Sequence, residues 1–165
     1  MNIEDLESKI WWSYLEEDLQ ELLKTAVLLA VEVSKWKQKF HDYSFIVFPA
    51  SKAYEGFLKK LFLDMGFISE EEFLGRRFRI GKALNPSLNR SRYKRQSVYD
   101  KIEKFCGGKK LANTLWDTWK NCRNLLFHWF PNERKAISYD QAVQKIGQVV
   151  SSIDAAFEEC KIGVK

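Results

Sequence analysis

The feature that most constrains the fold of this chain is the spacing of its apolar residues, which recur at steps of three and four with few interruptions. From residue 14 to about residue 41 the apolar positions are Leu15, Leu19, Leu22, Leu23, Ala26, Leu29, Ala30 and Val33. Such spacing places the side chains on one face of an amphipathic helix. Only three prolines and eight glycines interrupt the 165 residues, so the sequence favours helix over most of its length.

The other apolar runs predict further helices, separated by short breaks. Their expected ranges are 3–12, 44–65, 70–80, 97–106, 109–130 and 138–160. Few residues remain for strands. We therefore predict a single domain over residues 1–165, an all-α, up-and-down bundle of about five to seven helices that begins with a short leading helix.

Local signals indicate where several of these helices begin and end. Ser69 precedes Glu72 by three residues, which is a capping-box signature for the start of a helix. The run SFIVFPAS at residues 44–51 is strand-like in composition, but Pro49 suits the first turn of a helix. Helix ends are expected where breakers follow the apolar runs, at Gly66, Gly107 and Pro131.

Composition and cysteine usage exclude several classes of protein. A hydrophobic content of 45% and an aromatic content of 15% are not those of a disordered chain. No apolar run approaches the roughly 18 residues of a membrane span, and the start MNIEDLESKIWW lacks a signal-peptide pattern. Cys106, Cys122 and Cys160 are odd in number and widely spaced, which predicts a reducing, cytoplasmic protein in which Cys122 and Cys160 pack as small apolar residues.

Motifs for cofactors and metals are missing from the sequence. We find no P-loop, no GxSxG and no HExxH. The chain has only two histidines, His41 and His128, and His41 is expected to close the end of the first long helix. The sequence therefore predicts no cofactor and no metal site.

A basic block follows the expected helix at 70–80 and fills a loop at about 81–96. Residues 76–95 hold eight lysines and arginines and no aspartate or glutamate, whereas the whole chain carries a net charge of +5. Such a block is an electrostatic footprint for phosphate, although a solvated loop is an equally good explanation of the charge alone. The candidate RNA-binding residues are Arg76, Arg77, Arg79, Lys82, Arg90, Arg92, Lys94 and Arg95.

The expected helix at 109–130 has two different faces. Its core face holds Leu111, Leu115, Trp119, Cys122, Leu126 and Trp129. On the other face lie Arg123, Asn124 and His128, together with two large apolar side chains, Trp116 and Phe127. Apolar residues on a second face indicate a second partner, either another helix of the chain or a second copy of it.

Within this helix, RNLLFH places Arg123 five residues before His128, about 140° apart on an ideal helix. A loosened last turn or a two-fold partner is needed to bring the two side chains to one site. Histidine can act as a general acid or base near neutral pH, and arginine can hold phosphate oxygens. With no metal cluster in the sequence, the natural nucleophile is the 2′-hydroxyl of RNA. The alternative is an ordinary Arg–His pair that closes a helix end.

The RNLLFH segment and three longer segments of the chain resemble those of a known protein family. RNLLFH is similar to the R-x4-6-H motif of HEPN domains, with Asn124 as its polar residue. The ordered segments FPASKAYEGFLKKLFLDMGF, RFRIGKALNP and LWDTWKNCRNLLFHWFP resemble the HEPN domain of RNase LS toxins over roughly residues 40–160. The resemblance implies an all-α, metal-independent endoribonuclease toxin of a toxin–antitoxin system. RNase LS toxins are larger, and this chain resembles their HEPN domain alone.

The resemblance also implies roles for individual residues. Arg123 and His128 would be the catalytic pair, with Asn124 beside them, and Glu55 would match an acidic residue of the toxins. HEPN ribonucleases form their cleft where two domains meet, which implies a homodimer with Trp116 and Phe127 at the interface. For Glu55, the competing explanation is a solvent-facing helix residue paired with Lys52 or Lys59.

Two further functions stay open at this point. The chain would be a non-catalytic HEPN-like module that binds RNA, a nucleotide or a protein, with Arg123 and His128 only structural. Alternatively, it would be a HEPN subunit that works with a separate nucleotidyltransferase-type antitoxin.

Overall fold

The computed structural model describes residues 1–88, 97–129, 131 and 136–159, and in this part of the chain there are eight α-helices and no strand. The α-helices are α1 (Ile3–Glu7), α2 (Glu17–Lys35), α3 (Ser44–Asp64), α4 (Glu70–Leu74), α5 (Ile80–Ala83), α7 (Val98–Cys106), α8 (Lys110–Trp119) and α9 (Tyr139–Glu159). A 3₁₀ turn, η1 (Trp12–Tyr14), precedes α2, and a π-helical turn, η3 (Lys120–Asn124), continues α8. The predicted all-α class is confirmed.

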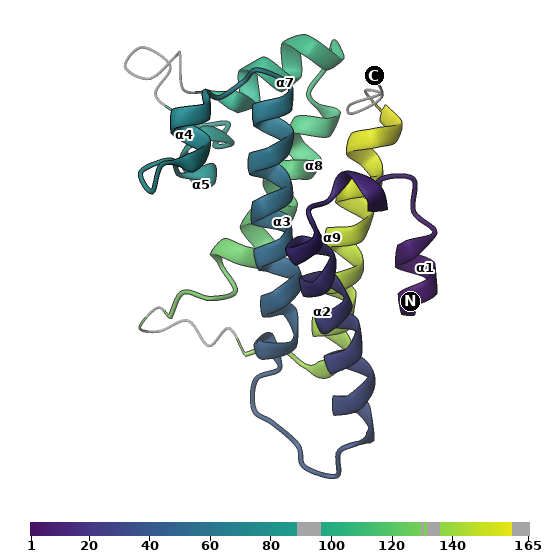
Figure 1. The fold of residues 1–165 in the computed structure, drawn as a ribbon. Helices are drawn as coiled ribbons and strands as arrows, with labels where there is room; N and C mark the ends of the chain where they lie inside the picture. The colour runs from purple at the N-terminus through teal and green to yellow at the C-terminus, as the bar shows by residue number, and fades with distance from the viewer. Residues whose placement is uncertain (89–96, 130, 132–135, 160–165) are drawn as a thin grey trace.

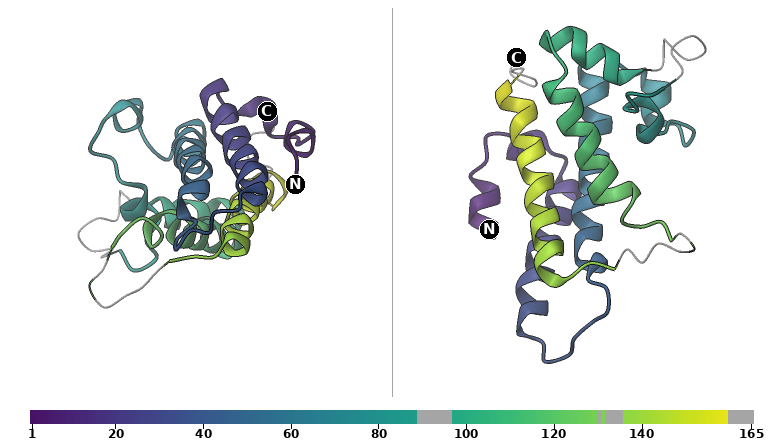
Figure 2. Two further views of the ribbon diagram at one scale, coloured as in Figure 1. Left: turned by 90° about the horizontal axis from the view of Figure 1, so that it is seen from below. Right: turned by 180° about the vertical axis from the view of Figure 1, so that it is seen from behind.

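The long helices run up and down beside one another (Figure 1). Helix α3 lies at the centre and packs against α2 on one side and α9 on the other, while α8 and η3 pack against both α9 and α3. Figure 2 shows the same bundle from below and from behind, with the short helices α4 and α5 beside the upper end of α3. This arrangement puts the middle of α3 next to η3, where the candidate catalytic residues lie.

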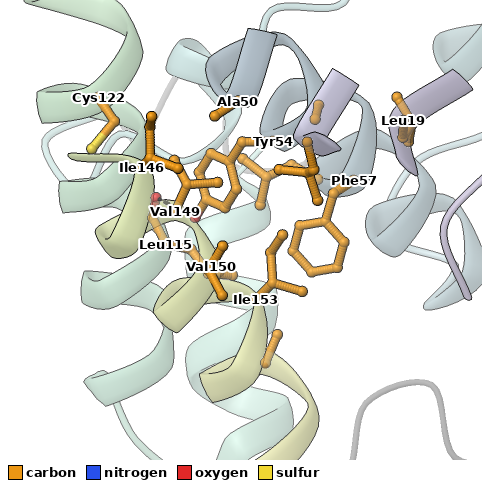
Figure 3. Packing of buried hydrophobic residues seen from close by; sticks show 14 of the residues in the cluster. Leu19, Ala50, Tyr54, Phe57, Leu115, Cys122, Ile146, Val149, Val150 and Ile153 are labelled. Carbon is orange, nitrogen blue, oxygen red and sulfur yellow. Dashed lines mark hydrogen bonds between the residues drawn. The ribbon is translucent and has the colours of Figure 1, made fainter. Parts of the chain in front are cut away.

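Helix α3 supplies the centre of the hydrophobic core (Figure 3). Tyr54 and Phe57 are fully buried, and their rings lie 6.0 Å apart between centroids. The Tyr54 hydroxyl lies 2.7 Å from the Ser152 hydroxyl on α9 and donates to the Leu115 carbonyl on α8 at 3.2 Å. Burial raises the pKa of the Tyr54 phenol, so the side chain stays neutral and links three helices through its hydroxyl.

Several helix ends lie where the local signals predicted them. The Ser69 hydroxyl accepts from the Glu72 amide, and the Glu72 carboxylate accepts from the Ser69 amide, which is the predicted capping box. Gly66 and Gly107 follow α3 and α7 with φ of 66° and 68°, the left-handed region that ends helices at low cost. Caps and glycines act within a few residues, so these ends need no tertiary partner.

Other predicted boundaries were wrong. The leading helix ends at Glu7 rather than residue 12, and α2 ends at Lys35 rather than 41. His41 therefore lies exposed in the α2–α3 loop and closes no helix. Beyond Lys35 the apolar periodicity gives way to an aromatic cluster in the loop, in which the rings of Trp36 and Phe40 lie 5.9 Å apart.

The predicted helix at 70–80 is two helices, because the chain is extended at Gly75 between α4 and α5. As a result, α5 occupies the start of the predicted basic loop at 81–96, and residues 89–96 lie outside the described residues. The strand-like run at 44–51 is helical, and Pro49 is inside α3 rather than in its first turn. Burial of its neighbours Ile46, Val47 and Ala50 in the bundle overrides their strand preference.

The cysteines differ from one another. Cys122 is free and buried in the core, as predicted. Cys106 at the end of α7 is disulfide-bonded, which the prediction of a reducing environment did not anticipate. Cys160 lies outside the described residues. A search of the described helices finds none with the length and apolarity that a membrane crossing requires.

Candidate active site

The position at which the helix predicted at 109–130 ends differs most from the prediction. The helix at 109–130 ends at Asn124, after a π-helical turn in which the Leu125 amide donates to the Lys120 carbonyl at 2.9 Å. Trp129, predicted in the core face, is 83% exposed. The chain therefore leaves the helix directly after Arg123 and Asn124, and His128 lies beyond the helix end. A loosened last turn is one of the two arrangements that the Arg123–His128 spacing left open.

Side chains from neighbouring helices hold this turn in place. The carbonyls at the end of a helix lack intrahelical donors and need other partners. The Ser51 hydroxyl on α3 donates to the Cys122 carbonyl at 2.5 Å, and the Lys145 ammonium on α9 donates to the Asn121 carbonyl at 3.0 Å. Ser51 is 2% exposed, so its hydrogen bond lies in the protein interior. Tertiary contacts, rather than Pro131, set the end of the helix.

Arg123 forms an ion pair with Glu55 of α3. The Arg123 Nε donates to Glu55 Oε2 at 3.2 Å, and the two side chains are 36% and 38% exposed. Glu55 thus pairs across the bundle, while Lys59, expected as its neighbour on α3, donates to the Phe73 carbonyl. A pair this exposed contributes little to stability. Its main effect is to fix the direction of the Arg123 guanidinium.

All four candidate catalytic residues line one cleft of about 490 Å³. Glu55 comes from the middle of α3, Arg123 and Asn124 from η3, and His128 from the segment after it. One wall is a pair of stacked indoles, Trp116 and Trp119, with centroids 5.7 Å apart. The remaining lining residues are Arg79, Ile80, Gly81, Lys82 and Asn85. The cleft therefore brings together an imidazole, a guanidinium, a carboxylate and further cations.

The basic block is divided among three places. Arg79 and Lys82 line the cleft. Arg76 and Arg77 lie exposed at a neighbouring hollow of about 750 Å³, which shares Arg79 and Lys82 with the cleft. Glu71 and Glu72 also line this hollow, and their carboxylates offset part of its positive charge. The predicted contacts Arg90, Arg92, Lys94 and Arg95 lie outside the described residues. Of the described residues of the basic block, only Arg79 and Lys82 line the cleft with the candidate catalytic groups.

A smaller hollow of about 260 Å³ adjoins the cleft and shares Glu55 and Arg123 with it. Its other walls are Phe48, Ser51, Lys52 and Phe127. The rings of Phe48 and Phe127 meet edge to face with centroids 5.5 Å apart. Phe127, predicted at a dimer interface, thus has a partner within the chain and is only partly exposed.

Comparison with known proteins gives a match to a protein family. Residues 14–81 match the family described as RnaseLS-like HEPN. The chain resembles the HEPN domain of RNase LS. The matched segment runs from η1 to the start of α5 and includes Glu55, but it ends before Arg123 and His128. No curated protein and no solved structure matches the chain.

Four cleft residues of this HEPN-like bundle were missed as site residues: Ile80, Gly81, Asn85 and Trp119. Trp119 was expected only in the core. A Cβ placed on Gly81 would lie 2.1 Å from Trp119 Cη2, so only glycine lets α5 approach this ring. The Trp119 Nε1 is buried and has no hydrogen-bond partner in the described part of the chain. No local signal links residues 81 and 119, because the contact joins two separate helices.

Gly81→Ala is therefore expected to disturb the cleft of the HEPN-like bundle. The added methyl group overlaps the Trp119 ring, and overpacking of this kind costs about 1–3 kcal/mol of the free energy of unfolding. Denaturant unfolding followed by tryptophan fluorescence measures the change. Gly108→Ala is the matched control, since nothing lies within 4 Å of its Cβ position. Equal stability of the two variants would contradict the close packing of Gly81 on Trp119.

The cysteine next to Arg123 does not supply a nucleophile to the HEPN-like site. Burial raises the pKa of the Cys122 thiol to about 11, and its Sγ lies 3.3 Å from Gln148 Oε1. A thiol with such a pKa is protonated at neutral pH, and the thiolate is the reactive form. Among the described residues no cluster of three or more His, Cys, Asp or Glu side chains is arranged to hold a metal ion.

Proposed function

We propose that the chain is a metal-independent endoribonuclease that cleaves RNA by attack of the substrate's own 2′-hydroxyl. Its likeness to HEPN domains indicates a function connected with RNA. The observation that carries the proposal is the shared cleft of Glu55, Arg123, Asn124 and His128, in which Arg79 and Lys82 add positive charge for the phosphate backbone.

In the proposed reaction the 2′-oxygen attacks phosphorus and the bond from phosphorus to the 5′-oxygen breaks. A base removes the proton of the 2′-hydroxyl, and an acid gives a proton to the leaving 5′-oxygen. The products are a 2′,3′-cyclic phosphate and a 5′-hydroxyl. His128 is the proton-transferring group, because histidine exchanges protons near neutral pH and His128 is the only described histidine that lines the cleft.

Arg123 is the proposed phosphate clamp. Its Nε donates to Glu55, which leaves the terminal nitrogens of the guanidinium for phosphate oxygens. Negative charge grows on those oxygens as the 2′-oxygen adds, and a positioned guanidinium stabilises it. Glu55 positions Arg123, and Asn124, the next residue on η3, is proposed to orient the RNA or His128.

We also propose that the active unit is a homodimer. The reaction needs a base and an acid, and two copies of His128 across a two-fold axis supply both. Trp116 and Phe127 are partly exposed beside the cleft and are the proposed interface residues. In this proposal the protein is a cytoplasmic toxin, and a protein antitoxin holds the enzyme inactive.

A second candidate is a non-catalytic module that binds RNA, a nucleotide or a protein. One observation favours it, since the family match ends at residue 81 and includes neither Arg123 nor His128. Such a module would bind RNA with an affinity that falls as salt rises, but it would cut nothing.

The deciding experiment compares two oligonucleotides of one sequence in EDTA. One is RNA throughout, and the other carries 2′-deoxy sugars at the positions cut in the first. The purified protein should cleave only the first and leave 2′,3′-cyclic phosphate ends, read by mass spectrometry. Binding without cleavage of the all-RNA strand would favour the module, and cleavage of the deoxy-substituted strand would exclude 2′-hydroxyl attack.

A further inference from the structure

The hollow of about 260 Å³ next to the cleft is lined by two phenylalanine rings beside charged side chains. Phe48, Lys52 and Glu55 of α3 are four and three residues apart, so their side chains share one face of the helix. Phe127 closes the hollow from the segment after η3. Phe48 is 55% exposed, although its ring contacts the Phe127 ring. A half-exposed aromatic ring beside charged groups offers a stacking surface.

We propose that this hollow is a pocket for one unpaired guanine base next to the scissile phosphate. The inference rests on the proposed function, because it treats the neighbouring cleft as the phosphate site. Glu55 and Arg123 line both spaces, so a base in the hollow and a phosphate in the cleft are adjacent groups of one nucleotide.

The size of the hollow suits a single base. At about 260 Å³ it is smaller than the roughly 300–1,000 Å³ of typical sites for drug-sized ligands. An aromatic ring at the wall stacks on any base, since every base has a π-face. The phenyl rings therefore account for binding of an unpaired base, but they do not select among bases.

The polar groups that line the pocket would distinguish guanine from the other three bases. The Ser51 hydroxyl already donates to the Cys122 carbonyl, so it is committed to the protein. Lys52 is exposed and offers a donor. Glu55 Oε2 accepts from Arg123 Nε, and the carboxylate keeps Oε1 and its remaining lone pairs as acceptors for a base. Guanine has two adjacent N–H donors on its Watson–Crick edge for a carboxylate and the O6 and N7 acceptors for an ammonium group. Adenine, cytosine and uracil lack the pair of adjacent donors.

The test is calorimetric titration of the four nucleoside 3′-monophosphates, which needs no cleavage. The guanosine nucleotide should bind at least about tenfold more tightly than the other three. Phe48→Leu keeps an apolar contact with Phe127 but removes the stacking ring. It should lower the binding affinity for each of the four nucleotides by about tenfold. Lys52→Met should lower the affinity for the guanosine nucleotide more than the affinity for the other three. Phe45→Leu and Lys39→Met are the matched controls, because both residues are exposed and neither lines the hollow.

Equal affinity for the four nucleotides would overturn the guanine pocket, and so would an unchanged affinity in Phe48→Leu. A cleavage assay distinguishes failure of the guanine pocket from failure of the proposed ribonuclease function. RNA with one guanosine in a run of uridines should be cut beside the guanosine. Cleavage at every position, with no preference in the titration, would refute the pocket and keep the ribonuclease. Guanosine binding without any cleavage would keep the pocket and refute the ribonuclease.

Discussion

Replacement of His128 by alanine is expected to lower the rate of RNA cleavage by about a hundredfold to ten-thousandfold, the range for loss of a general acid or base. The fold should persist, because His128 is exposed and lies beyond the end of η3. Single-turnover cleavage in EDTA measures the rate, and thermal unfolding measures stability. Arg123→Ala should cause a comparable loss through the missing phosphate clamp.

The chain contains a matched control for this prediction. His41 is the other histidine, and it is exposed in the α2–α3 loop and does not line the cleft. His41→Ala should therefore cleave RNA at the wild-type rate. Equal rates for the two histidine variants would remove His128 from the proposed mechanism, provided that both proteins unfold at the wild-type temperature.

Replacement of Phe57 by alanine should have the largest effect on stability. Phe57 is fully buried at the centre of the bundle, where its ring lies 6.4 Å from the Tyr14 ring and 6.4 Å from the Phe157 ring, between centroids. Loss of the ring leaves a cavity among three helical segments. Substitutions of this kind lower the free energy of unfolding by about 3–5 kcal/mol. Urea denaturation followed by circular dichroism measures the difference.

A phenylalanine on the surface of the same helix provides the comparison. Phe45 of α3 is 38% exposed, and Phe45→Ala should change the free energy of unfolding by less than about 1 kcal/mol. If Phe57→Ala lowered the free energy of unfolding no more than Phe45→Ala does, the packing of α3 against α2 and α9 in Figure 3 would be incorrect.

Much of the fold was predictable because its signals are local. The apolar spacing identified every long helix of the described chain, and the Ser69 capping box and Gly107 fixed helix ends correctly. The boundaries that failed depended on distant residues. The helix predicted at 109–130 ends at Asn124, where the Ser51 hydroxyl of α3 and the Lys145 ammonium of α9 donate to its last carbonyls.

The candidate site was predictable in its residues but not in its geometry. Glu55, Arg123, Asn124 and His128 were selected from the sequence and do line one cleft, although their catalytic role is a proposal that cleavage assays must test. Half of the predicted RNA contacts, in residues 89–96, lie outside the described residues. The contribution of Gly81 and Trp119 had no sequence signal, since it arises where α5 meets α8.

The sequence by itself determined a helical bundle with an arginine and a histidine near the end of its penultimate long helix. Periodicity, caps and breakers suffice for this, because each acts within one or two turns. Only the tertiary structure decided that the helix ends at Asn124 through the hydrogen bonds from Ser51 and Lys145, and that Glu55 holds Arg123. These contacts join residues far apart in the chain, so their partners become neighbours only when α3, η3 and α9 pack together.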